Sequence, residues 1–174
     1  MGNGRRLQSL RMFVAVVAVA AAVGCSSMSV SAGGSHMRAG ARVALPATSR
    51  NEVAALAEQI NRHRRAIGCT ALLPDSRLAA VARRHSEDMV RRRFFDHTNP
   101  DGRDPFDRLR AAGVRFRAAA ENIAQGRSRG RETYEDWIES RGHRHNIENC
   151  DYTHYGIGLY RDTWTLELAR YTDD

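Results

Sequence analysis

Residues 137–147 read WIESRGHRHNI. Apolar side chains before and at the start of this stretch recur at helical spacing, which predicts a helix over residues 132–140 that buries Trp137. The polar half of the stretch contains two imidazoles. We expect His143 to be a binding residue, with capping of a helix N-terminus as its alternative role. His145 has the spacing of a second chelating ligand on an irregular turn, but we expect it at the surface.

Three shorter segments accompany this stretch, namely FFDHT at 94–98, AENIA at 120–124 and YGIG at 155–158. His97 and Glu121 are the side chains in them that can hold a cation. Imidazoles and a carboxylate suit a first-row divalent ion such as zinc, although ligands so far apart cannot be assigned from spacing. The alternatives are a hydrogen-bonded loop histidine and a carboxylate that structural partners keep charged.

Taken in order, the four segments resemble the F-x-H-T, E-N-I-A, W-x-x-S-x-G-H-R-x-N-I and G-I-G motifs of the CAP superfamily. This superfamily is named for cysteine-rich secretory proteins, antigen five and plant pathogenesis-related proteins, and the resemblance is closest to its short bacterial members. It implies an α+β fold, a three-layer α-β-α sandwich with helices packed on a small, mainly antiparallel sheet. It also implies a cleft in which His97, Glu121 and His143 can bind zinc or another divalent metal.

One cleft position departs from the family pattern. Many eukaryotic members have Glu three residues after the helix Trp, whereas this chain has Ser140, and the nearest carboxylate, Glu139, comes one residue earlier. One residue turns a helix by about 100°, so Glu139 need not enter the cleft, and Ser140 could hydrogen-bond a bound water instead. With one carboxylate fewer, we expect zinc to bind less tightly.

The rest of the pattern predicts further helices and a terminal hairpin. Ser49 and Glu52 form a capping-box pair at the start of the first helix. Asp75 or Ser76 is expected to cap the second helix, and Asp104 the third. His85 lies on the apolar stripe of the second helix and is expected to be a core histidine. Period-two alternation predicts strands at 155–160 and 163–169, with a further extended segment near 118–124.

The N-terminal segment predicts export. Arginines precede an apolar run over residues 12–23, which has the length of a signal-peptide core and is too short to span a bilayer. The run ends at Cys25 in a context that resembles a lipoprotein cleavage box. We therefore expect a signal peptide over 1–24, a flexible tether over 25–48 and a folded domain over 49–174. Lipidated Cys25 would attach the chain to the outer face of the cytoplasmic membrane; plain secretion is the alternative.

The other two cysteines, Cys69 and Cys150, lie in the predicted domain. Two thiols in an exported domain most often pair, so a disulfide is expected. The alternative, two ligands of a structural zinc ion, lacks the nearby CxxC partner that such sites usually have. All 27 basic residues are Arg, against 20 acidic ones. Without the three signal-peptide arginines the net charge falls from +7 to about +4, which does not indicate nucleic-acid binding.

The leading hypothesis is an exported, non-catalytic module that binds a small apolar ligand or a component of the cell envelope, as a monomer. The alternative is a zinc-dependent hydrolase of peptides or esters, with the metal at His97 and His143 and Glu121 as the base. A serine hydrolase with Ser140 as nucleophile is disfavoured, because the chain has no G-x-S-x-G turn and no marked oxyanion hole.

Overall fold

The structure, a computed structural model, describes residues 47–172. The predicted signal peptide, Cys25 and almost all of the predicted tether lie outside this range. Among the helices of the described part, none combines the length and the apolar composition that crossing a bilayer requires. Export and lipidation therefore stay predictions.

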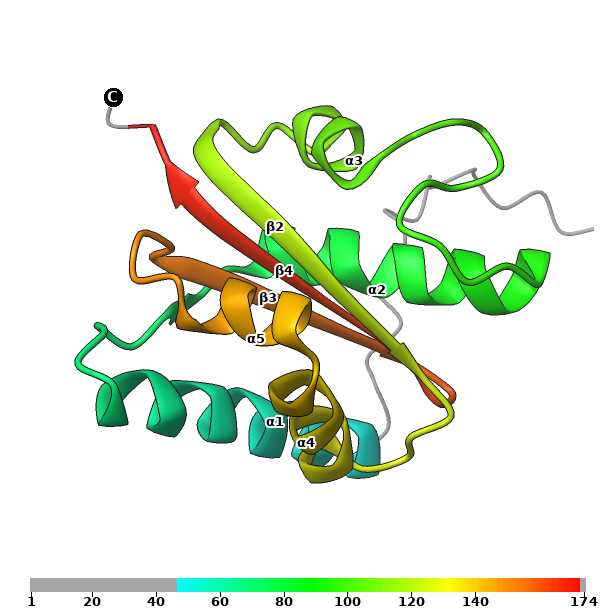
Figure 1. The fold of residues 1–174 in the computed structure, drawn as a ribbon. Coiled ribbons are helices and arrows are strands. Elements are labelled where there is room, and N and C mark those ends of the chain that lie inside the picture. Colours follow the sequence, from blue (N-terminus) through cyan, green and yellow to red (C-terminus); the bar gives the residue numbers. More distant parts are fainter. Residues whose placement is uncertain (1–46, 173–174) are drawn as a thin grey trace, which may run out of the picture. The chain divides into compact units, whose positions relative to one another are not determined.

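The middle layer is a four-stranded sheet with the order β1-β3-β4-β2 (Figure 1). Its strands are β1 (Leu73–Pro74), β2 (Phe116–Gln125), β3 (His154–Tyr160) and β4 (Thr163–Tyr171). Strands β3 and β4 form the predicted hairpin, and β2 pairs antiparallel with β4. The short β1, which the sequence did not predict, pairs parallel with β3. The mainly antiparallel sheet is confirmed, and β2 is one of its edges.

Helices cover both faces of the sheet (Figure 1). One face carries α1 (Ala47–Ala66), α4 (Gly130–Glu139) and α5 (Arg141–Glu148), and the other carries α2 (Ser76–Arg92) and α3 (Pro105–Ala111). Two groups of buried apolar side chains follow this division. Trp137 of α4 packs in one group with Leu166 of β4, and Leu78 of α2 packs in the other with Leu109 of α3. The predicted three-layer sandwich is confirmed.

Local capping starts α2 and α3 where the sequence predicts. Asp75 Oδ1 accepts hydrogen bonds from the backbone amides of Arg77 and Leu78. Asp104 and Asp107 form a reciprocal capping box at the start of α3. Each carboxylate satisfies amides that have no partner within the helix. Both helices that later position the candidate site are therefore fixed by short-range signals.

Helix α2 lies close against β3 at two glycines. A Cβ atom on Gly156 would overlap the backbone at Ala79, and one on Gly158 would overlap the backbone at Arg83. Glycine within a strand often marks such a close approach of another backbone segment. The G-I-G motif therefore has a packing role, because it allows the helix to touch the sheet.

The predicted capping box of the first helix is wrong, and one helix was missed. Helix α1 begins at Ala47, so Ser49 lies inside its first turn and does not cap it. The Glu52 carboxylate instead accepts a hydrogen bond of 2.9 Å from the backbone amide of Gly130, at the start of α4. Residues 141–148, for which the sequence analysis predicted no helix, form helix α5.

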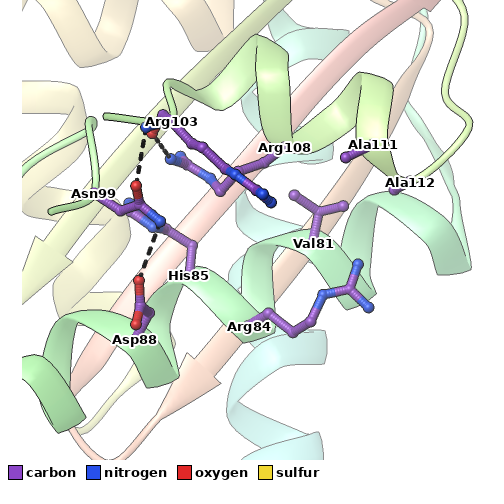
Figure 2. Close-up of a pocket in the computed structure, with 9 residues that line it drawn as sticks. All are labelled: Val81, Arg84, His85, Asp88, Asn99, Arg103, Arg108, Ala111 and Ala112. Atoms are coloured by element: carbon purple, nitrogen blue, oxygen red, sulfur yellow. Dashed lines mark hydrogen bonds between the residues drawn. The ribbon is translucent and has the colours of Figure 1, made fainter. Parts of the chain in front are cut away.

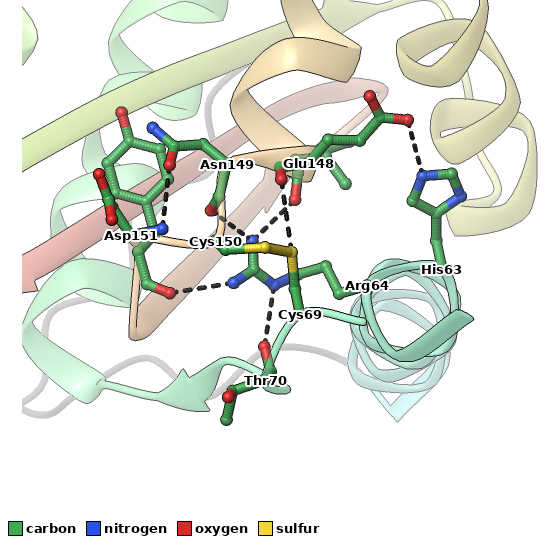
Figure 3. Close-up of a disulfide and its surroundings, with 10 residues drawn as sticks. His63, Arg64, Cys69, Thr70, Glu148, Asn149, Cys150 and Asp151 are labelled. Carbon is green, nitrogen blue, oxygen red and sulfur yellow. Dashed lines mark hydrogen bonds and ion pairs between the residues drawn. A yellow bond between two sulfur atoms is a disulfide. The ribbon is translucent and has the colours of Figure 1, made fainter. Parts of the chain in front are cut away.

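A disulfide joins Cys69, just after α1, to Cys150, just after α5 (Figure 3). This confirms the expected pairing over the zinc alternative. Arg64 lies beside the disulfide and is fully buried. Its guanidinium donates four hydrogen bonds of 2.7–3.2 Å to backbone carbonyls, those of Thr70, Ile147, Asn149 and Tyr152. We call Arg64, the disulfide and these carbonyls the disulfide corner.

Candidate functional site

Glu121 lies on edge strand β2 with only 1% of its side chain exposed, yet it holds two close ionic partners. His97 Nδ1 donates to its Oε1 at 2.7 Å, and Arg108 donates to its Oε2 at 2.6 Å. Both carboxylate oxygens are therefore engaged. We call Glu121, His97, Arg108, His85 and Glu167 the Glu121 cluster.

Arg108 joins three parts of the chain. Besides its bond to Glu121, its guanidinium donates to the backbone carbonyls of His97 at 2.7 Å and Arg103 at 3.0 Å (the latter bond is drawn in Figure 2). Helix α3, started by the Asp104 cap, thus connects β2 to the loop that follows α2. This connection is what brings His97 against Glu121.

The ion pair between His97 and Glu121 shifts their two pKa values in opposite directions. Burial alone raises the pKa of Glu121, but the hydrogen bond from His97 and the charge of Arg108 outweigh burial and leave it below its ordinary value. The same hydrogen bond is the main reason that the pKa of His97 is raised. Both shifts favour a charged imidazolium–carboxylate pair.

Glu167 of β4 stands directly opposite Glu121 in the register of the two strands. It is fully buried, and among the described residues no N–H group or hydroxyl donates to its carboxyl oxygens. Burial, and next the negative charge of Glu121, raise the pKa of Glu167 well above its ordinary value. A buried carboxyl without a donor is far less costly when neutral, so Glu167 is the protonated member of this carboxyl pair.

His85 of α2 also lies close to Glu121. It is buried, as predicted; its Nε2 donates to the backbone carbonyl of Asp96 at 3.1 Å and lies 3.8 Å from Glu121 Oε1. Burial lowers the pKa of His85, which favours the neutral ring. His85 is therefore a neutral neighbour of the charged pair.

His143 lies near this cluster without joining it. Its ring packs on Trp137 with 6.5 Å between ring centres, and its backbone carbonyl accepts a 3.0 Å hydrogen bond from Asn122. Burial lowers the pKa of His143, and the positive charge of His97 lowers it further. Among the described residues His143 makes no hydrogen bond or ion pair with Glu121. The structure therefore brings two of the three predicted side chains into contact and places the third nearby.

The two candidates for the fourth position lie at the end of α4. Ser140 is half-buried at the junction of α4 and α5, and its hydroxyl does not cap α5. Glu139 is exposed, and its charge acts on Arg127, whose pKa it helps to raise after the larger effect of Asp136. Neither side chain forms a hydrogen bond with Glu121 in the part of the chain that the structure describes.

This arrangement does not fit a resident metal ion. Across residues 47–172, no three His, Cys, Asp or Glu side chains are placed so that they could hold one. Glu121 already has a cation at each oxygen, and the ring nitrogen of His97 nearest to it is committed as a donor. Metal binding at His97, Glu121 and His143 stays a prediction that this geometry does not support.

Arg108 and Glu167 were missed at the sequence level. Nothing local marks Arg108, because its partner lies on another element. Glu167 did carry a signal. It sits in a strand whose alternate positions are apolar, and in a three-layer sandwich the opposite positions of a central strand are buried too.

Comparisons with known proteins agree with the fold. The model of the cysteine-rich secretory protein family, CAP, matches residues 57–167. Two proteins of Bacillus subtilis (strain 168) are each 38% identical to this chain. The uncharacterized protein YkwD matches over 113 residues, 64% of this chain and 44% of its own length. The uncharacterized membrane protein YlbC matches over 103 residues, 59% and 30%. The chain thus spans less than half of each of these curated relatives.

Solved structures show the same architecture. An extracellular protein containing an SCP domain from Bacillus anthracis superposes with a TM-score of 0.68 and 32% identity, over 70% of this chain and 41% of that one. An outer surface protein from Borrelia burgdorferi superposes with a TM-score of 0.66 over 71% and 96%; at 19% identity it shows the fold alone. All four sequence segments that carried the resemblance fall inside the matched residues. The chain belongs to the CAP family of cysteine-rich secretory proteins.

Proposed function

We propose that this chain is an exported, non-catalytic binding module whose ligand contacts His97. One observation carries the proposal: Glu121 is buried, and a cationic side chain is bound to each of its two carboxylate oxygens. Export is supported by the signal-like N-terminal segment and by the similarity to an extracellular protein of Bacillus anthracis.

His97 is the member of the Glu121 cluster that can reach a ligand. Its side chain is 48% exposed, whereas those of Glu121 and His85 are almost inaccessible. The bond from Nδ1 to Glu121 fixes the ring, so Nε2 is the nitrogen available for recognition. Because the pKa of His97 is raised, Nε2 acts chiefly as a donor, which favours a ligand with a hydrogen-bond acceptor.

A hydrolytic role fits the same residues less well. A general base needs a pKa near the working pH and access to the water that it deprotonates. Glu121 has a lowered pKa, is buried, and would have to leave two ionic partners to act. We therefore treat zinc-dependent hydrolysis as an outcome that the experiment can reveal.

The partner and the anchor are part of the proposal. We infer a small apolar ligand or an envelope component as partner, no nucleic acid, a monomeric chain, and attachment to the outer face of the cytoplasmic membrane through lipidated Cys25. Cys25 lies outside the described residues; its anchoring role is supported by the sequence context alone.

Native mass spectrometry of the full chain, purified from its own cell envelope, tests the proposal. We expect a bound small molecule that is lost in His97→Ala and kept in His154→Ala, since His154 lies on strand β3 and outside the Glu121 cluster. The same preparations are assayed on fluorogenic peptides and chromogenic esters, with and without added zinc. Turnover that disappears in Glu121→Gln would overturn the non-catalytic assignment.

A further inference from the structure

A second candidate site lies between α2 and α3 and shares two lining residues, Arg108 and His85, with the Glu121 cluster. It is a cavity of about 490 Å³, within the usual size range of small-ligand pockets. Its lining combines three arginines with a small apolar wall, namely Arg84, Arg103, Arg108, Val81, Ala111 and Ala112. We call this cavity the α2–α3 pocket. We propose that it binds a small oxyanion, a carboxylate or a phosphate, that carries a short apolar group.

The lining of the α2–α3 pocket has more positive than negative side chains, three arginines against one carboxylate. Arg108 is neutralised by Glu121. Asp88, the one carboxylate in the lining, has Arg92 within 3.6 Å and accepts a hydrogen bond from Asn99 (Figure 2). The guanidinium groups of Arg84 and Arg103 have no hydrogen bond or ion pair among the described residues. The negative charge of Asp101 acts on Arg103, but Asp101 is itself paired with Arg92. Arg84 and Arg103 therefore carry positive charge that no carboxylate of the described residues contacts directly.

These two arginines are placed to act together. In Figure 2 their guanidinium groups lie on either side of Val81, one from α2 and one from the loop before α3. Arg103 is anchored through its backbone, since its carbonyl accepts from Arg108 and its amide donates to Asn99. Guanidinium groups bind carboxylate and phosphate oxygens through paired N–H donors, so such a pair selects planar or tetrahedral oxyanions.

The apolar part of the lining limits which groups a bound anion can carry. Val81, Ala111 and Ala112 present methyl groups without polar partners, so the remainder of the ligand should be short and apolar. This ligand class differs from the acceptor at His97, and the α2–α3 pocket does not require the proposed function to hold.

Isothermal titration of the full chain at low ionic strength tests the site with three probes, inorganic phosphate, propionate and the uncharged propionamide. We expect both anions to bind and propionamide not to bind, and the tighter anion identifies the natural class. In the double variant Arg84→Gln/Arg103→Gln we expect binding to weaken at least about tenfold, because charge-assisted hydrogen bonds are lost.

The matched control is Arg110→Gln/Arg131→Gln, which also removes two positive charges, but from exposed positions outside the pocket. We expect it to bind the anions within about twofold of the wild type. Equal weakening in both double variants, equal binding of propionamide, or no binding of either anion by the wild type would each overturn the proposal. Thermal unfolding of both variants confirms that they are folded.

Discussion

The disulfide corner and the Glu121 cluster each bury a charge, but they satisfy it differently. Arg64 meets backbone carbonyls, which cannot titrate, next to a covalent bond. Glu121 meets side chains that can gain or lose protons, beside a protonated carboxyl and a half-exposed imidazole. The first arrangement only holds the fold together. The second responds to its surroundings, which is why we place the function there.

The largest expected effect comes from Arg64→Met. The change keeps much of the side-chain volume but leaves buried carbonyls without donors, and we expect the free energy of unfolding to fall by about 4 kcal/mol. Urea unfolding measures this. Because only carbonyls accept from Arg64, the loss should be the same between about pH 5 and pH 8. The control is Arg62→Met, an exposed residue paired with Glu58, which should cost less than about 1 kcal/mol. A pH-dependent loss in Arg64→Met would remove the contrast between the two regions.

Glu121→Gln comes next. It leaves the largely buried Arg108 without its counter-ion, and we expect a loss of about 3 kcal/mol in the free energy of unfolding. The matched control is the same substitution on the facing strand, Glu167→Gln. A protonated carboxyl and an amide are both neutral and similar in shape, so this change should cost less than about 1 kcal/mol. Equal losses for the two variants would contradict the assignment of the charge to Glu121 and the proton to Glu167.

The smallest effect is a pH dependence at His97. Its pKa is raised above the ordinary 6.5 by the bond to Glu121, so the stability from this bond is fully present below pH 6.5. It is lost as the pH rises through the higher pKa of the folded state. The pKa of Glu121 is lowered from 4.5, so its contribution is present above pH 4.5 and is lost as the pH falls through its folded-state pKa.

Ring-proton NMR gives the direct measurement. We expect the His97 signals to titrate above 6.5 in the wild type and at a lower pH in Glu121→Gln. The stability difference between the wild type and His97→Gln should shrink as the pH rises. A His97 signal that titrates identically in the wild type and Glu121→Gln would sink the proposed pairing.

Most of the fold could be predicted because its signals are local. Asp75 and Asp104 cap the helices that follow them, and the period-two pattern of β3 and β4 is continuous in the chain. Predictions failed where a partner lay far away in sequence. Glu52 was predicted to cap the helix in which it lies, but its carboxylate accepts a hydrogen bond from the backbone amide of Gly130. The charged helix α5 has one fully buried side chain, that of Ile147, so its form depends on docking more than on its own apolar pattern.

The candidate site was predicted only in outline. Motif resemblance selected His97, Glu121 and His143, and the structure brings the first two into contact. The resemblance could not show that Arg108 would bind the second oxygen of Glu121. Arginines are frequent throughout this chain, and most of those that the structure describes are exposed. Because Arg108 is the counter-ion of Glu121, this carboxylate has no oxygen free for a metal ion or a ligand.

The contact at Gly156 and Gly158 has a practical consequence for anyone who wishes to redesign this protein. A side chain at either glycine would push α2 away from the sheet, so the position of His85 and of one wall of the α2–α3 pocket depends on these two residues of β3. New specificity is better sought by exchanging side chains on α3 and on the loop before it. That half of the pocket can be rebuilt while the backbone contact serves as a fixed template.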